Sequence, residues 1–79
     1  MKLPRAITGK ELIASLSDLG YTVTRQSGSH IRLTTEVNGT HHITVPDHRP
    51  LKVGTLSSIL SDVAQHHGME RDQLIAQLF

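Results

Sequence analysis

Hydrophobic residues in the first quarter of the chain recur with the period of a helix. Leucine and isoleucine occupy positions 12, 13, 16 and 19, which lie on one face of a helix, and Gly20 follows as a natural end. Thr8 and Glu11 have the spacing of a capping box, and Ile7 and Leu12 are placed for a hydrophobic staple. The pattern therefore predicts a first helix that starts after Thr8 and ends before Gly20.

From residue 21 onward, hydrophobic and polar residues alternate as they do in strands. The alternation predicts a short strand over 21–25 that ends at a turn over 27–29, a second strand over 30–34 and a third over 42–45. The inward positions of the second and third strands are apolar, namely Ile31, Leu33, Ile43 and Val45. The outward positions are polar, namely His30, Arg32, Thr34, His42 and Thr44.

The residues between the second and third strands predict how the two strands pair. A two-residue turn at Asn38-Gly39 would set Thr34 opposite Ile43, although directly opposed residues must share a face. A three-residue loop over 37–39, with Gly39 in the left-handed conformation, removes this conflict. The resulting pairs are Leu33 with Ile43, Ile31 with Val45, Arg32 with Thr44 and His30 with Pro46. His30 would then lie near Asp47 and His48.

The last third of the chain returns to helical spacing. Thr55 is predicted to be the N-cap of a second helix that stops at Gly68, and residues 70–78 predict a short last helix. The buried stripe of the second helix is Leu56, Ile59, Leu60 and Val63, and the last helix runs through Leu74, Ile75 and Leu78. We therefore expect one α+β domain over 1–79 with the order α-β-β-β-α(-α), in which helices cover one face of a three-stranded antiparallel sheet.

Composition narrows the functional classes. The chain has 79 residues and no cysteine, which leaves room for a surface site but not for a deep cofactor cavity or a cysteine zinc site. No apolar run reaches the roughly 20 residues that span a bilayer, so we expect a cytoplasmic protein without a membrane partner. The net charge is +1, but residues 1–54 carry seven Lys or Arg against four acids. This basic part suits a phosphate-bearing partner, and scattered solvated charges explain it equally well.

His30 is the strongest candidate for chemistry, because it opens a strand on the exposed face directly after the flexible Gly28-Ser29 pair. An imidazole with an ordinary pKa near 6.5 can take or give a proton at neutral pH. Arg32 shares the face of His30 and is a candidate phosphate anchor. The neighbouring pairs His41-His42 and His66-His67 point in different directions within each pair, so we predict no metal and no cofactor. We interpret His66 and His67 as residues that interact with the dipole of the second helix.

Several short motifs together resemble the HicA family of bacterial toxins. They are Thr8-Gly9-Lys10-Glu11-Leu12, Gly20-Tyr21, Gly28-Ser29-His30, Val45-Pro46-Asp47-His48 and Gly54-Thr55-Leu56. The resemblance implies a fold like the double-stranded-RNA-binding domain and a messenger-RNA-cleaving ribonuclease whose catalytic residue is His30. It also implies a HicB-type antitoxin that covers the site. An aromatic residue that family members commonly carry after this histidine is absent, since Ile31 and Leu33 stand there.

The chemistry of the residues is compatible with metal-independent RNA cleavage. His30 would act as general base toward a ribose 2′-hydroxyl, Gly28 and Ser29 would let the sugar-phosphate approach the backbone, and His48 is a possible auxiliary group. Lys10, Arg32 and Lys52 are candidate RNA contacts, and the amides that begin the second helix near Lys52 offer a further anion site. Two alternatives stay open at this point: a catalytically silent RNA-binding module, and a domain whose polar sheet face docks a protein.

Overall fold

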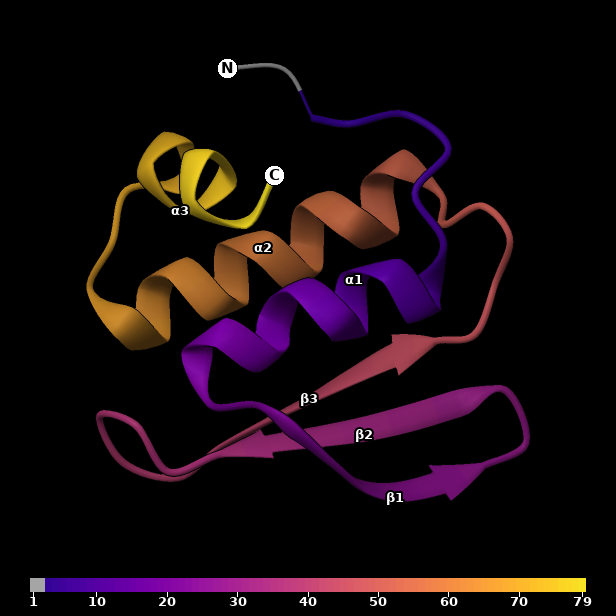
Figure 1. The fold of residues 1–79 in the computed structure, drawn as a ribbon, viewed down its shortest axis with the longest axis horizontal. Helices are drawn as coiled ribbons and strands as arrows, with labels where there is room; N and C mark the ends of the chain where they lie inside the picture. Colours follow the sequence, from indigo (N-terminus) through magenta and orange to yellow (C-terminus); the bar gives the residue numbers. More distant parts are fainter. Residues whose placement is uncertain (1–2) are drawn as a thin grey trace.

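The computed structural model describes residues 3–79, and its elements follow the predicted order (Figure 1). They are α1 (Gly9–Leu16), the short 3-10 helix η1 (Ser17–Leu19), β1 (Thr22–Ser27), β2 (His30–Thr35), β3 (His41–Pro46), α2 (Val53–His67) and α3 (Arg71–Leu78). The α+β class is confirmed. Helices α1 and α2 cover the inner side of the sheet, and α3 packs on α2 (Figure 1).

Local sequence signals fix both ends of the first helical segment. The Thr8 hydroxyl accepts from the Glu11 amide at 3.1 Å, and the Glu11 carboxylate accepts from the Thr8 amide at 2.9 Å, so the predicted capping box forms. The Thr8 amide, and secondly its hydroxyl, hold the pKa of Glu11 below its usual value. At the other end, Gly20 has a φ of 83°, which stops the helix as predicted, although its last three residues are 3-10 rather than α-helical.

The sheet is antiparallel in the order β1-β2-β3, and the predicted register of β2 with β3 is confirmed. Leu33 pairs with Ile43, Ile31 with Val45, Arg32 with Thr44 and His30 with Pro46. The ladder ends at Thr35 and His41, so the connecting loop covers residues 36–40, two more than predicted. Within that loop Gly39 has a φ of 93°, the left-handed conformation that the sequence required of it.

Strand β1 differs from the other two strands, because all six of its residues are exposed. Tyr21 is buried but precedes the strand, while Val23, which pairs with the fully buried Leu33, is 53% exposed. A β-bulge lies between Val23 and Arg25. Figure 1 shows β1 at the edge of the sheet farthest from the helices, which explains why its inward position is left open.

The core forms where α1 and α2 meet β2 and β3. The predicted stripe of α2 is buried, as are Leu74 and Ile75 of α3, and Gly68 ends α2 with a φ of 64°. The prediction that Thr55 is the N-cap of α2 is wrong, because the helix starts at Val53 with Lys52 as N-cap and no capping side chain. The start is fixed by tertiary contacts instead: Leu51 is buried, and its amide donates to the Ile7 carbonyl at 2.8 Å.

Candidate active site

The residues predicted to carry chemistry gather at one end of the molecule. The 28–29 turn, the end of β3 and the first residues of α1 and α2 all lie at the right of Figure 1. The 36–40 loop and the end of α2 lie at the left of the same view. We call the first region the His30 end and the second the His41 end.

His30 is the first residue of β2 and is exposed. It pairs with Ser27 of β1 and with Pro46 of β3, so it stands on the middle strand with backbone on both sides. Its imidazole has no hydrogen-bond or ion-pair partner among residues 3–79. Both ring nitrogens are therefore available to a ligand, whereas a histidine held for stability normally spends at least one of them on the protein.

The Gly28-Ser29 turn positions His30 at the start of β2 and is hydrogen-bonded to the residue that follows β3. Gly28 has a φ of 58° at the first position of a two-residue hairpin loop, where glycine is favoured. An added Cβ there would meet nothing within 4 Å, so its backbone is open to an approaching group. The carbonyl of Ser29 accepts from the Asp47 amide at 2.6 Å, and this bond ties the turn to the end of β3.

Gly9 holds the segment from Pro46 to His48 against the start of α1. The Gly9 amide donates to the His48 carbonyl at 3.0 Å. A Cβ added to Gly9 would stand 2.0 Å from the Pro46 carbonyl oxygen, which no side chain can tolerate. Gly9 belongs to one of the motifs noted above, but nothing in the sequence pattern around it indicates this close approach.

Asp47 brings an acidic side chain to this arrangement, because its amide binds the 28–29 turn. Its carboxylate lies 3.9 Å from the Lys10 ammonium, whose side chain is 65% exposed, so this ion pair is weak. The second carboxylate oxygen of Asp47 is buried and has no hydrogen-bond partner among residues 3–79. The structure thus brings Lys10, Asp47 and the backbone of His48 together beside the 28–29 turn, as the register predicted for the last two. The His48 side chain is exposed.

Arg32 is exposed two residues along β2 from His30, on the same face. Lys52 is exposed at the N-cap of α2, whose first amides have no side-chain cap. Sequence reasoning missed Arg25, which pairs directly with Arg32 across the sheet and is also exposed. The bulge in β1 places it there, and the alternation of residue types gave no signal of that bulge.

At the His41 end, three histidines and Tyr21 form a connected network. The Tyr21 hydroxyl lies 2.7 Å from His41 Nδ1 and 3.1 Å from His67 Nε2, and His41 Nε2 lies 3.1 Å from an Asp62 oxygen. The rings of His41 and His66 stack with centroids 4.3 Å apart. Sequence reasoning treated these histidines as separate neighbouring pairs, whereas the fold brings together one member of the first pair and both members of the second.

The hydrogen-bond partners in this network show which histidine ring nitrogens carry a proton. His66 Nε2 lies 2.9 and 3.1 Å from the carbonyls of Val37 and Gly39, which only accept, so this nitrogen carries a proton. His41 Nε2 likewise donates to Asp62. In the neutral form of His41, Nδ1 carries no proton and accepts a hydrogen bond from the Tyr21 hydroxyl. The oxygen of this hydroxyl in turn accepts a hydrogen bond from His67 Nε2. Both histidines lie in the last turn of α2, as the interpretation that they interact with the helix dipole required, and the fold adds contacts of His66 to the 36–40 loop and of His67 to Tyr21.

Burial within this network changes two pKa values. Burial, and secondly the charge of Asp62, raise the pKa of Tyr21 to about 12. Burial, and then the nearby imidazoles of His66 and His41, lower the pKa of His67. Both shifts favour the uncharged forms, in keeping with a network that stabilises the fold.

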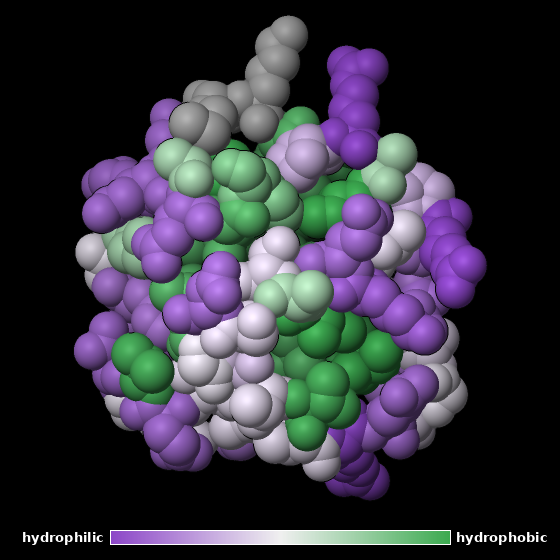
Figure 2. All heavy atoms as spheres, viewed as in Figure 1, coloured by the Kyte–Doolittle hydropathy of each residue, from purple (hydrophilic) through white to green (hydrophobic). Residues whose placement is uncertain are grey.

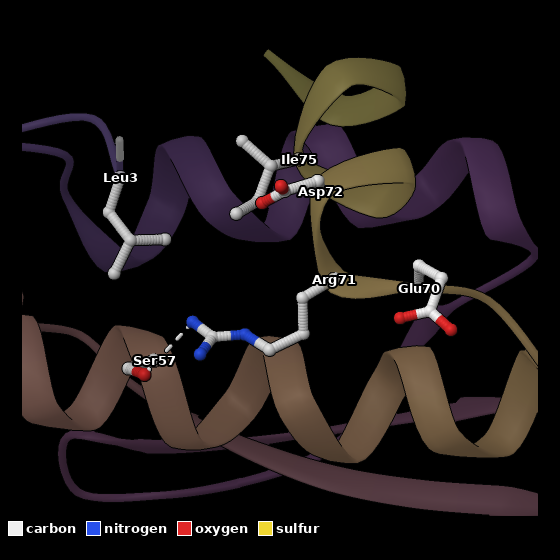
Figure 3. A pocket seen from close by; sticks show the side chains of 6 residues that line it. All are labelled: Leu3, Ser57, Glu70, Arg71, Asp72 and Ile75. Carbon is white, nitrogen blue, oxygen red and sulfur yellow. Dashed lines mark hydrogen bonds between the residues drawn. The ribbon is translucent and has the colours of Figure 1, made fainter. Parts of the chain in front are cut away.

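Other parts of the surface carry less chemistry. Figure 2 shows apolar areas separated by hydrophilic side chains on one side of the molecule, and the large exposed apolar residues are Val23, Val37, Val53 and Phe79. A cleft of about 750 Å³ lies between the N-terminal segment, α2 and α3, where Arg71 donates to the Ser57 hydroxyl at 3.0 Å (Figure 3).

Among residues 3–79, no three His, Cys, Asp or Glu are arranged to hold a metal ion. No helix in the described part of the chain could cross a membrane.

The fold order and the exposed histidine beside a glycine turn define a small α+β domain with a candidate site at the head of β2. Residues 9–65, well over half of the chain, match the model of the HicA toxin of bacterial toxin-antitoxin systems. The chain therefore belongs to the HicA toxin family, which makes it the toxin component of such a system and implies an antitoxin as its partner. No curated protein and no solved structure gives a significant match.

Proposed function

We propose that this toxin is a metal-independent endoribonuclease that cleaves messenger RNA with His30 as general base. The observation that carries the proposal is the state of His30, which is exposed at the head of β2 without a partner in the described chain. It lies beside an open glycine turn and shares its face with an arginine. The family match supports a toxin role, and the free imidazole supplies a chemistry for it.

In the proposed reaction, His30 removes the proton from a ribose 2′-hydroxyl. The oxygen attacks the adjacent phosphorus, the bond to the 5′-oxygen breaks, and the leaving oxygen takes a proton from a general acid or water. The products are a 2′,3′-cyclic phosphate and a 5′-hydroxyl end. His48 is the auxiliary candidate for the acid, because the Gly9 and Ser29 contacts hold its segment at the His30 end.

Cations and backbone amides at the same end would stabilise the charge on phosphorus. Arg32 anchors a phosphate next to His30, and Lys10 and Lys52 extend the RNA contacts along the starts of α1 and α2. The uncapped amides at the start of α2 add donors that favour an anion. Gly28 and Ser29 leave the turn open for the sugar-phosphate. The antitoxin, which we propose to be of the HicB type, would inhibit by covering His30.

The test is the variant His30→Ala, expressed in cells without the antitoxin and assayed as purified protein on RNA. We expect growth inhibition and cleavage to fall by about 10²- to 10⁴-fold, the usual contribution of a general base. Wild-type products should end in a 2′,3′-cyclic phosphate, detected by the resistance of the 3′ end to enzymes that require a free hydroxyl. Chelation of divalent ions should leave the wild-type rate unchanged.

His42→Ala is the matched control, because His42 is also an exposed outward-facing histidine on the same sheet. It should cleave RNA at the wild-type rate. Full cleavage by His30→Ala would overturn the catalytic assignment. RNA binding without cleavage by the wild-type protein would favour a silent RNA-binding module, and neither binding nor cleavage would favour a domain that docks a protein.

A further inference from the structure

We propose that Arg25 and Arg32 together bind one phosphate of the RNA. This phosphate is adjacent, along the same strand, to the phosphate at which His30 cleaves. The inference rests on the proposed ribonuclease function for its ligand, and it adds a residue and a defined subsite to that function. It starts from the outward face of the sheet, where side chains from the three strands stand in rows.

Two adjacent rows on this face differ in their chemistry. One row runs Ser27, His30 and Pro46 across the three strands. The next row runs Arg25, Arg32 and Thr44. Because the rows are two residues apart along β2, their side chains are separated by about 6.6 Å. Neighbouring phosphates along an RNA strand are separated by a similar length, so a strand with one phosphate at His30 brings another to the arginines.

The bulge in β1 creates the arginine pair. Up to Val23 the register pairs Val23 with Leu33, and continued without interruption it would set Thr24 opposite Arg32 and Arg25 opposite the buried Ile31. The extra residue at Thr24 instead places Arg25 opposite Arg32, on the exposed face. Bulges often re-aim a side chain beside an active site in this way.

The pair is electrostatically unfavourable without a ligand. Like charges directly opposite each other in a sheet are destabilising. Neither guanidinium has a hydrogen bond or ion pair to a side chain anywhere in residues 3–79, and the two salt bridges in that range join Lys10 to Asp47 and His41 to Asp62. A phosphate between the two guanidinium groups would satisfy their donors and turn the repulsion into attraction.

The row on the other side of the arginines offers no such site. There, the Thr24 hydroxyl lies 2.9 Å from that of Thr34, which lies 2.8 Å from His42 Nδ1. These polar groups satisfy one another. Among the residues that the structure describes on this face, the only arginine or lysine side chains are Arg25 and Arg32, which stand in the row next to the proposed base.

The experiment measures binding of a short single-stranded RNA as a function of salt, in a His30→Ala background that prevents cleavage. A side chain that neutralises one phosphate of a single strand adds about 0.7 to the slope of log K against log salt. Because the two arginines share one phosphate, we expect the double variant Arg25→Gln/Arg32→Gln to reduce the slope by about 0.7, and each single variant to reduce it by no more than that. The difference in affinity between the parent and the double variant should then shrink by a factor of about 2.6 between 50 and 200 mM salt.

Arg71→Gln is the matched control, since it removes the same charge from α3, in the helix layer. The double variant should also keep a melting temperature equal to or above that of the parent, because a repulsive pair has been removed. A slope equal to that of Arg71→Gln would overturn the proposal. So would RNA affinity of the double variant equal to that of the parent at every salt concentration. If the slope falls as expected while His30→Ala still cleaves RNA in assays, the phosphate site stands and the catalytic role of His30 fails.

Discussion

His30 and His41 lie at opposite ends of the β2–β3 ladder, where His30 pairs with Pro46 and His41 with Thr35. The imidazole of His41 is half-buried, bonds to Tyr21 and Asp62 and stacks on His66. The imidazole of His30 is exposed and bonds to nothing in residues 3–79. Two histidines of one hairpin thus differ in whether their ring nitrogens are hydrogen-bonded within the protein. The bonded histidine supports the structure, and the unbonded one is available for chemistry.

The largest contrast is expected between alanine substitutions at these two positions. His30→Ala should lose about 10²- to 10⁴-fold in cleavage rate but change the free energy of unfolding by less than about 0.5 kcal/mol, as exposed substitutions usually do. His41→Ala should retain the cleavage rate. Urea denaturation and RNA cleavage, measured on both variants at a temperature where both are folded, check this. Equal losses of activity in both would abolish the distinction.

Gly9→Ala should damage the His30 end through the backbone. The added methyl group collides with the Pro46 carbonyl, so we expect the variant to lose about 1–3 kcal/mol of stability as overpacked cores do, and to lose cleavage as the segment holding His48 moves. Gly54→Ala is the control, because a Cβ at that helical position meets nothing within 4 Å and should stabilise slightly. A Gly9→Ala protein as stable as the Gly54→Ala protein would contradict the close approach.

His41→Ala should weaken the opposite end. Removing the imidazole leaves the buried Tyr21 hydroxyl with one partner fewer and Asp62 without its donor, which should cost about 1–3 kcal/mol. Urea denaturation measures the loss. His42→Ala, whose side chain bonds only to the Thr34 hydroxyl on the exposed face, should lose less. Similar losses in the two variants would show that the network adds no stability of its own.

The histidine network also predicts a pH dependence of stability. The pKa of His67 is lowered in the folded protein, so below its ordinary value near 6.5 the unfolded chain binds a proton that the folded chain resists. Stability should therefore fall as the pH drops below about 6.5. Urea midpoints of the wild type between pH 7.5 and 5.5 test the sign, and His67→Gln should show a flatter profile. A profile in the variant as steep as that of the wild type would assign the effect to another group.

The smallest effect is expected from the Lys10 and Asp47 pair. Lys10→Met should change stability by less than about 0.5 kcal/mol, because the ion pair is long and mostly exposed. The same substitution should have a separate effect on RNA binding. If Lys10 contacts a phosphate, the slope of log K against log salt should decrease by about 0.7. Thermal denaturation and RNA titration at several salt concentrations measure the two effects. An unchanged slope would remove Lys10 from the RNA contacts.

Much of the fold could be read from local rules. The capping box at Thr8 and Glu11 and the stop at Gly68 depend on residues a few positions apart, so local chemistry decides them. The β2–β3 register followed from the requirement that Ile43 face the core. The start of α2 was missed because Leu51 is held by Ile7, a contact across 44 positions that no capping pattern announces.

The sequence by itself determined the order of the elements, the pairing of β2 with β3 and the place of His30 beside Pro46, because alternation, turn glycines and helix caps act over a few residues. Only the tertiary structure decided which histidines would be satisfied. Tyr21 meets His41 and His67 from 20 and 46 positions away, and Gly9 touches Pro46 only because α1 packs on β3. The bulge that turns Arg25 toward Arg32 is likewise a property of strand pairing. Contacts between distant segments depend on how helices and strands pack, and the spacing of residues along the sequence does not predict that packing.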